Sequence, residues 1–148
     1  MIIKNGLVFH ESGKFEKRDL YVEGDKIART AQGETIDATG LYVIPGLTDL
    51  HFHGCVGYDF CDGTVEAINN MAEYELSQGI TTICPASMTF SEERLNKIFA
   101  AAKEYKGETG AELVGINMEG PFIDPKKKGA HEESFIHKPS ADFFKECN

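Results

Sequence analysis

Short apolar runs and turn residues alternate over the first 43 residues. Two such runs are Leu7–Phe9 and Leu20–Val22, and glycines such as Gly13 and Gly24 lie between the runs. The apolar residues do not follow the three- and four-residue spacing of a helix. Short β-prone runs separated by turn residues are typical of strands joined by tight turns. We therefore predict that residues 1–43 form a small antiparallel β-module.

Longer elements follow this module. Apolar runs typical of buried strands alternate with stretches in which apolar residues recur at helical spacing. The predicted strands are Leu41–His53 (with a bend at Pro45-Gly46), Ile80–Pro85 and Leu113–Met118, and the predicted helices run from the cap Thr64 to about Ser77, from the cap Ser91 to about Tyr105, and onward from the cap Ser140. This alternation favours a parallel sheet with right-handed crossovers.

Apolar residues mark one face of each of the first two predicted helices. These faces consist of Val65, Ile68, Met71, Ala72 and Leu76 in the first helix, and of Leu95, Ile98, Phe99 and Ala102 in the second. An apolar stripe is the side of a helix that faces the core. We therefore expect both stripes to pack on the sheet.

The formal net charge of −9 over 148 residues narrows the range of partners. Nucleic acids and anionic membranes bind basic surfaces, so we expect neither as a partner. A local cationic pocket could still hold a small anionic substrate. The sequence contains no apolar stretch with the length of a membrane-spanning helix, and its N-terminus lacks the features of a secretory signal.

The cysteines indicate a reducing compartment. They are Cys55, Cys61, Cys84 and Cys147, and no two of them form a CxxC pair. A chain of this size fills a core without disulfides, so we interpret them as free, buried thiols. The expected location is therefore the cytoplasm.

Candidate chemistry lies at the ends of the predicted strands. His51 and His53 end the first strand and Glu119 follows the third. Side chains at positions i and i+2 of a strand point to the same face, and ligands of parallel α/β folds bind beyond the carboxyl ends of the strands. Two imidazoles and a carboxylate suit zinc or iron, and a metal would offset the cost of burying Glu119. We predict these three residues as metal ligands; histidines held by core hydrogen bonds are the alternative interpretation.

The polar loop after Glu119 adds a second group of candidates. Gly129 allows the backbone to approach a ligand closely, and His131 returns an imidazole towards the same rim. The lysines that precede them are typical of a solvated loop. No role is assigned to His10 or His137.

These motifs resemble those of a known enzyme family. ATGLYVIPGLTDLHFHG (residues 38–54) resembles the opening signature of the amidohydrolase superfamily, in which a strand ends in HxH at a metal site. INMEGPF (residues 116–122), followed by KKKGAH (residues 126–131), resembles the N-acetylglucosamine-6-phosphate deacetylases, and QGITTICPASMT (residues 78–89) is similar to their second barrel strand. The likeness covers essentially the whole chain.

The resemblance implies a fold and an activity. The fold class is α/β: residues 44–148 would form the N-terminal part of a (β/α)8 TIM barrel, about three β/α units, and residues 1–43 part of a small β-sandwich. The implied reaction, a step of amino-sugar catabolism, hydrolyses the acetamide of N-acetylglucosamine 6-phosphate to glucosamine 6-phosphate and acetate. It depends on one or two divalent metal ions, zinc or iron, and family members are usually homodimers.

The resemblance also implies roles for individual residues. Glu119 matches the glutamate that binds the main metal, and His51 and His53 match the pair that holds a second metal in binuclear members. Ala130 matches a position whose backbone contacts the sugar, and His131 lies beside it in the substrate pocket. The chemistry fits, because a divalent metal polarises an amide carbonyl and an aspartate then serves as general base and acid.

The family's remaining machinery is not found in these 148 residues. Two further metal-binding histidines, the catalytic aspartate and the phosphate clamp belong to later strands, and a barrel needs roughly 250 residues. We therefore expect the N-terminal part of a longer enzyme, with no catalytic residue in this chain and no activity of the isolated chain. The alternatives are another amidohydrolase, such as a dihydroorotase-like or deaminase-like cyclic amidase, and a non-catalytic fragment.

Overall fold

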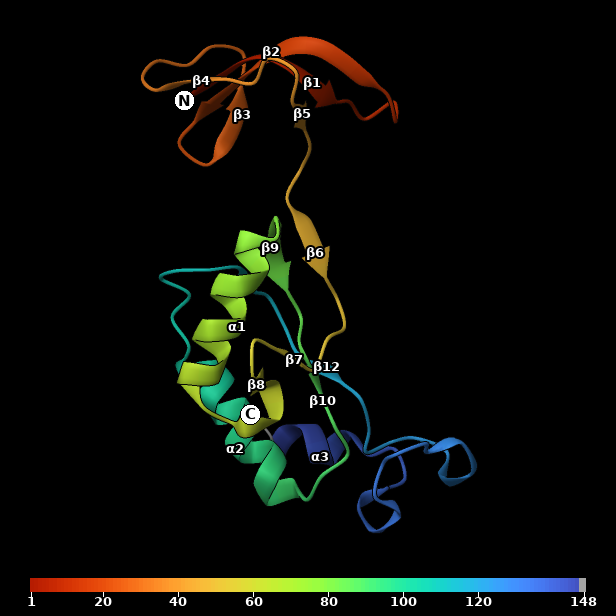
Figure 1. Ribbon diagram of the computed structural model, residues 1–148. Coiled ribbons are helices and arrows are strands. Elements are labelled where there is room, and N and C mark those ends of the chain that lie inside the picture. Colours follow the sequence, from red (N-terminus) through yellow and green to blue (C-terminus); the bar gives the residue numbers. More distant parts are fainter. Residues whose placement is uncertain (147–148) are drawn as a thin grey trace. The chain divides into compact units, whose positions relative to one another are not determined.

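The computed structural model describes residues 1–146. The chain divides into two compact units, Met1–Pro45 and a second that begins at Gly46 (Figure 1). Among the described residues, no helix combines the length and apolarity that crossing a membrane requires. The assignment of residues 1–43 to a β-sandwich domain and of residues 44–148 to a hydrolase barrel stays a prediction.

The first unit is a single sheet built around two long paired strands. Its strands are β1 (Ile2–Phe9), β2 (Phe15–Glu23), β3 (Lys26–Ala28), β4 (Thr35–Asp37) and β5 (Tyr42–Val43), in the order β3-β2-β1-β4, with β5 also paired to β1. The antiparallel prediction is confirmed for β1, β2 and β3. It is wrong for β4 and β5, which run parallel to β1. Turn residues mark where strands end, but the direction of each strand depends on which edge the chain returns to.

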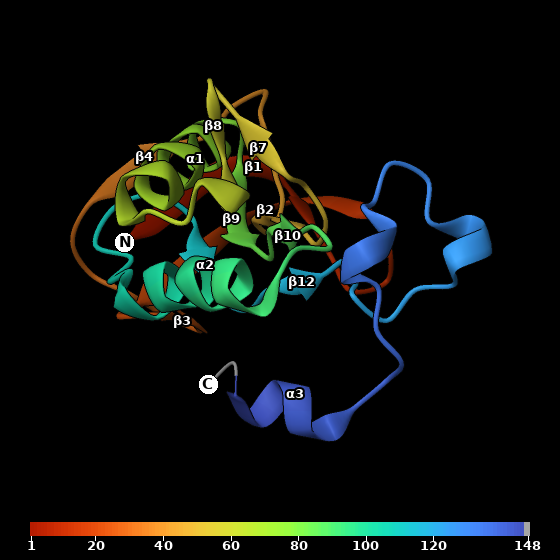
Figure 2. The ribbon, with the colours of Figure 1, turned by 90° about the horizontal axis from the view of Figure 1, so that it is seen from below.

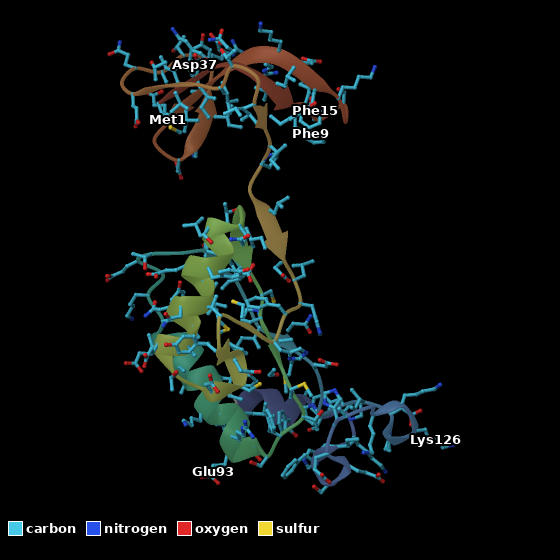
Figure 3. The ribbon with its side chains drawn as sticks, in the orientation of Figure 1. Met1, Phe9, Phe15, Asp37, Glu93 and Lys126 are labelled. Carbon is cyan, nitrogen blue, oxygen red and sulfur yellow. The ribbon has the colours of Figure 1, made fainter. Side chains whose placement is uncertain are left out.

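Aromatic side chains from β1, β2 and β5 pack against one another. Phe9 and Phe15 meet edge to face with ring centroids 5.4 Å apart (Figure 3), and Tyr42 packs in the same way on Phe15 at 4.8 Å. A Cβ at Gly6 would lie 2.7 Å from Val43 Cγ2. Glycine therefore allows β5 to pack close beside β1.

The second unit is an α/β unit with parallel strand pairs. Its strands are β6 (Leu47–Asp49), β9 (Ile80–Ile83) and β11 (Glu112–Leu113) in the order β11-β9-β6, the parallel pair β10 (Ala86–Ser87) and β12 (Asn117–Met118), and the antiparallel hairpin β7 (Gly54–Cys55) and β8 (Tyr58–Asp59). Its helices are α1 (Val65–Ser77), α2 (Glu92–Glu104), α3 (Ala141–Glu146) and the short 3-10 helices η1 (Phe60–Asp62), η2 (Pro125–Lys127) and η3 (Glu133–Phe135). The parallel pairing is the predicted one.

All three predicted strands are shorter than expected. The apolar run from Leu41 is shared between two units: β5 pairs with β1, β6 pairs with β9, and Ile44–Gly46 lies between them. Leu41, Ile44 and Leu47 are exposed, so the prediction of one buried strand is wrong. Proline lacks the N–H that a sheet ladder needs, which explains the break at Pro45.

The second and third predicted strands are each interrupted, at neighbouring positions. Pro85 separates β9 from β10, and the opposite strand divides into β11 and β12. Val114 N donates to Ile83 O and Asn117 N to Pro85 O, so the pairing continues across the break. The two short sheets therefore form one interrupted parallel arrangement rather than the continuous strands that were predicted.

The two long helices begin at the predicted caps. Thr64 Oγ1 accepts a hydrogen bond from Ala67 N, and Ser91 Oγ accepts one from Arg94 N. The helices lie next to each other (Figure 2) and share one core cluster that includes Phe60, Met71 and Leu95. The predicted helix after Ser140 is confirmed as α3.

The predicted apolar face of α1 is wrong at its last turn. Leu76 is 44% exposed, whereas Glu75 beside it is 6% exposed. Burial, followed by the nearby Asp49 carboxylate, raises the pKa of Glu75, while a hydrogen bond with the Cys55 thiol lowers it. Helical spacing alone could not identify this position, because it places both residues near the edge of the apolar stripe.

The cysteines of the described part of the chain are free thiols. Cys61 is buried as predicted, whereas Cys55 and Cys84 are only half-buried. Cys147 lies outside the described residues.

Candidate metal centre

The two histidines of the HxH motif follow the end of β6. Their backbone has left the strand, but Cys84 N still donates to Asp49 O and Ala86 N to Phe52 O, so the segment remains extended beside the β9–β10 region. An Asp49 carboxylate oxygen accepts a hydrogen bond from His51 N at 2.9 Å. Phe52 packs against the core, which directs the flanking His51 and His53 side chains away from it, as the i, i+2 spacing predicts.

Glu119 approaches from the end of β12. The neighbouring Asn117 anchors this strand end, because its side-chain amide donates to Leu50 O at 2.9 Å. Gly120 follows with φ +88°, a left-handed conformation that favours glycine. The turn allows the chain to leave the strand directly after the carboxylate.

Three imidazoles surround this carboxylate. Glu119 Oε2 lies 2.9 Å from His53 Nε2 and 3.5 Å from His51 Nε2, and Glu119 Oε1 lies 3.3 Å from His131 Nε2. The rings of His51 and His53 stand nearly perpendicular, with centroids 5.2 Å apart. Residues from three separate segments of the chain thus converge at one strand-end site.

The electrostatics of the site favour the ionised carboxylate. Burial by itself raises the pKa of Glu119. The hydrogen bond from His131 and the electrostatic interactions with His131, His53 and His51 outweigh burial, and the net pKa of Glu119 is lowered. A carboxylate at this position is therefore charged at neutral pH, as a metal ligand must be.

The residues fit a divalent transition metal. One ligand atom each from His51, His53 and Glu119 lies within 4.8 Å of the others. Ligands at about 2.0–2.1 Å from a tetrahedral ion lie about 3.4 Å from one another, and Glu119 Oε2 lies 3.5 Å from His51 Nε2 and 2.9 Å from His53 Nε2. Glu119 Oε2 is buried and accepts no hydrogen bond of good geometry, although both imidazoles are close to it. An oxygen in this position can accept a cation.

The structure places the two predicted sugar-contacting residues differently. His131 is buried and lies against Glu119, whereas Ala130 is exposed on the loop. Their roles towards a sugar stay predictions. The loop that contains Lys126–Lys128 contacts this region through Lys128, whose Nζ donates a hydrogen bond to His131 O at 2.9 Å.

Sequence reasoning missed Thr89. Its backbone N–H donates to His131 Nδ1 at 3.2 Å, and its hydroxyl donates to Glu119 O at 3.4 Å. Thr89 follows β10, which pairs with the strand that carries Glu119. The predicted end of the second strand at Pro85 was the available signal, but a threonine four residues later is not a typical metal ligand.

Comparisons with known proteins agree with one another. No protein-family model matches the chain. A human N-acetylglucosamine-6-phosphate deacetylase is 31% identical over 147 residues, which cover 90% of this chain and 36% of that protein. The solved deacetylase from Thermotoga maritima is 31% identical with a TM-score of 0.82, and the match covers 99% of this chain and 39% of that one. The solved deacetylase from Pasteurella multocida is 26% identical with a TM-score of 0.84, and the match covers 97% of this chain and 40% of that one.

These findings confirm the resemblance that the motifs predict. The chain resembles N-acetylglucosamine-6-phosphate deacetylases over almost its entire length. It spans less than half the length of the relatives that it matches.

Proposed function

We propose that this chain forms the N-terminal part of an N-acetylglucosamine-6-phosphate deacetylase, which releases acetate and glucosamine 6-phosphate from its substrate. The observation that carries the proposal is the convergence of His51 and His53 on Glu119, in a chain similar to deacetylases throughout. HxH alone suits many amidohydrolases. The order HFH, EGPF and KGAH narrows the choice to this reaction.

The fold of the parent enzyme follows from the same similarity. We infer that the parallel strands of the second unit are the first part of a (β/α)8 barrel and that the first unit belongs to a β-sandwich. The parallel pairing of β6, β9 and β11, with α1 and α2 between successive strands, supports this proposal. The site then lies at the carboxyl ends of the strands, where barrel enzymes place their chemistry.

The residues of this chain would hold a divalent metal. Glu119 supplies a charged oxygen ligand, and His51 and His53 supply nitrogen ligands. A divalent metal, when bound, acts as a Lewis acid that polarises an amide carbonyl and favours the ionisation of water. An intact HxH pair favours a site for two ions; zinc and iron both suit these ligands.

Other parts of the catalytic machinery would lie outside this sequence. Among the described residues, the cluster able to hold an ion contains no aspartate, and the nearby Asp49 carboxylate already accepts a hydrogen bond from the His51 backbone. The general base and the phosphate-binding groups are therefore expected in the rest of the enzyme. We therefore expect no deacetylase activity from the 148-residue chain by itself. A homodimer and a cytoplasmic location stay predictions of the same kind.

The test is acetate release from N-acetylglucosamine 6-phosphate by the full-length parent enzyme, supplied with zinc or iron. We expect turnover that the Glu119→Gln variant loses and that Glu93→Gln, an exposed change on α2 (Figure 3), retains. A panel of cyclic amides measured in parallel distinguishes other amidohydrolase reactions. Absence of turnover with either metal, or hydrolysis of cyclic amides alone, would contradict the proposal.

A further inference from the structure

One peptide group of the HxH segment is held by side chains at both of its polar atoms. This group joins Leu50 to His51. Leu50 O accepts a hydrogen bond from the Asn117 side-chain amide at 2.9 Å. His51 N donates to an Asp49 carboxylate oxygen, also at 2.9 Å. Side chains therefore fix the orientation of the peptide plane from which the first imidazole departs.

The flanking peptide groups are held differently. The carbonyl oxygens of Asp49 and Phe52 accept hydrogen bonds from the backbone of the adjacent strand segment, at Cys84 N and Ala86 N. Between these two ladder bonds, the Leu50–His51 peptide depends on its side-chain partners. The Asn117 amide is the partner that comes from a distant part of the chain, 67 residues away from Leu50.

The Asn117 hydrogen bond connects strands that are not neighbours. β6, just before the histidines, pairs with β9, and β12, which carries Asn117, pairs with β10, the continuation of β9 beyond Pro85. Strands two positions apart in a flat sheet lie about 9–10 Å from each other. A short amide side chain bridges that gap only where the two outer strand ends curve towards each other. The bond therefore stabilises an inward curvature at the level of the histidines.

The candidate metal centre requires the same curvature. Glu119 lies two residues after Asn117 and reaches the same HxH segment. Its Oε2 lies 2.9 Å from His53 Nε2 and 3.5 Å from His51 Nε2. One strand end thus contacts the HxH segment twice: the amide binds its backbone, and the carboxylate approaches its imidazoles.

We propose that Asn117 is a positioning residue for the metal centre: its amide fixes the Leu50–His51 peptide and thereby sets the distance between the histidine ligands and Glu119. The proposal rests on the proposed metal site. Ligands that are already held at the right separation lose less conformational freedom when an ion binds. Loss of the amide therefore lowers metal affinity although every ligand remains.

The chain offers a matched control for this amide. Asn70 on α1 also donates through its side-chain Nδ2 to a backbone carbonyl, Glu66 O, at 2.8 Å. Exchange of either asparagine for leucine nearly preserves the side-chain volume and removes the donor. Asn117→Leu breaks the bond to the HxH segment, whereas Asn70→Leu breaks a bond of the same kind within α1.

The experiment measures the zinc affinity of the full-length parent enzyme and of both variants by competition with a chromophoric chelator, in the absence of sugar. We expect Asn117→Leu to weaken zinc binding about tenfold, and Asn70→Leu to stay within about twofold of the wild type. Equal affinity of Asn117→Leu and the wild type, or equal losses in both variants, would overturn the proposal while leaving the proposed function intact. A wild-type enzyme that binds no zinc would overturn both.

A spectroscopic readout separates positioning from a general loss of stability. The d–d absorption bands of bound cobalt(II) report the coordination geometry of the ion. We expect these bands to change in Asn117→Leu and to stay as in the wild type in Asn70→Leu. Weaker binding with an unchanged cobalt spectrum would indicate a purely structural role and would overturn the proposal.

A crystal structure of the metal-free parent enzyme remains decisive if Asn117→Leu does not fold. We expect Asn117 Nδ2 to lie within hydrogen-bond distance of Leu50 O both before and after zinc is added. An amide that contacts Leu50 O only in the zinc-bound enzyme would overturn the proposal, because it would then follow the metal rather than prepare its site.

Discussion

Gly120, the residue after the candidate ligand Glu119, has no space for a side chain. A Cβ there would overlap the Thr89 hydroxyl, and the backbone has φ +88°. Gly79 has nearly the same conformation, φ +85°, but a Cβ added at Gly79 would have no neighbouring atom within 4 Å. The pair separates backbone strain from steric overlap.

We predict that Gly120→Ala destabilises the protein more than Gly79→Ala does. Both changes incur the left-handed backbone penalty of about 1–2 kcal/mol, and overlap at Gly120 adds about 1–3 kcal/mol. Urea denaturation of the two variants measures the difference in the free energy of unfolding. Equal losses would show that Thr89 moves aside without cost.

The reactivity of Cys61 and Cys55 reports how strongly the second unit shields these thiols from solvent. Burial raises the pKa of Cys61 to about 11, and burial followed by the Glu75 carboxylate raises that of Cys55 to about 11. The thiolate is the reactive form, so it is scarce at pH 8 and becomes abundant only as the pH approaches 11.

We predict that iodoacetamide modifies Cys61 and Cys55 at pH 8 about two orders of magnitude more slowly in the folded protein than in urea, where a thiol has a pKa of about 8.5. Mass spectrometry of the modified peptides measures each rate separately. The folded-state rate should increase steadily between pH 8 and pH 11. Rates at pH 8 that match those in urea would contradict the expected pKa values.

At the scale of elements, the start of α1 depends on one hydroxyl. Thr64 Oγ1 accepts from Ala67 N at 3.2 Å and satisfies an N–H that the helix leaves unpaired. α1 also carries Ala67, Ile68 and Met71 into the core. A less stable α1 therefore weakens the packing of the whole second unit.

We predict that Thr64→Ala lowers the free energy of unfolding of the second unit by about 1 kcal/mol. Thr64→Ser retains the hydroxyl and is the control, with an expected change of only a few tenths of that value. Chemical denaturation followed by circular dichroism measures both. A Thr64→Ser variant as unstable as Thr64→Ala would mean that the methyl group, rather than the cap, matters.

Predictability at this scale differs between helices and strands. Helix caps are local, and Thr64 and Ser91 could be identified from neighbours within four residues. Strand lengths depend on partners far along the chain. The break at Gly115 between β11 and β12, for example, accompanies the break at Pro85 in the strand beside it.

At the scale of the whole molecule, the candidate metal centre joins segments that are distant in sequence. His51, Glu119 and His131 come together only when β6, β12 and the loop after β12 are in place. A metal that binds this arrangement binds the folded chain in preference to the unfolded one. Metal affinity and stability are therefore coupled.

We predict that zinc at a hundred times its Kd increases the free energy of unfolding of the native protein by about 2.7 kcal/mol. A chelator such as EDTA should reverse the gain, and Glu119→Gln should show little of it. Thermal unfolding with and without zinc measures the effect. Equal stabilisation of the wild type and Glu119→Gln would place the metal elsewhere.

Local signals in the sequence were sufficient for the class of fold, the positions of α1 and α2, and the pairing of HxH with Glu119 as candidates for one site. These features depend on periodicity, capping and strand-end position, which involve only nearby residues. The motif resemblance to deacetylases was equally visible, and the comparisons confirm it.

Only the tertiary structure decided which groups meet. The burial of Glu75 in place of Leu76, the parallel direction of β4 and β5, and the contact of Thr89 with His131 all depend on the arrangement of distant segments. The different neighbours of the two Glu119 oxygens, His51 and His53 at Oε2 and His131 at Oε1, also depend on that arrangement. A sequence states which side chains can donate, accept or bind a metal, but hydrogen bonds act over about 3 Å, and only folding brings groups that close.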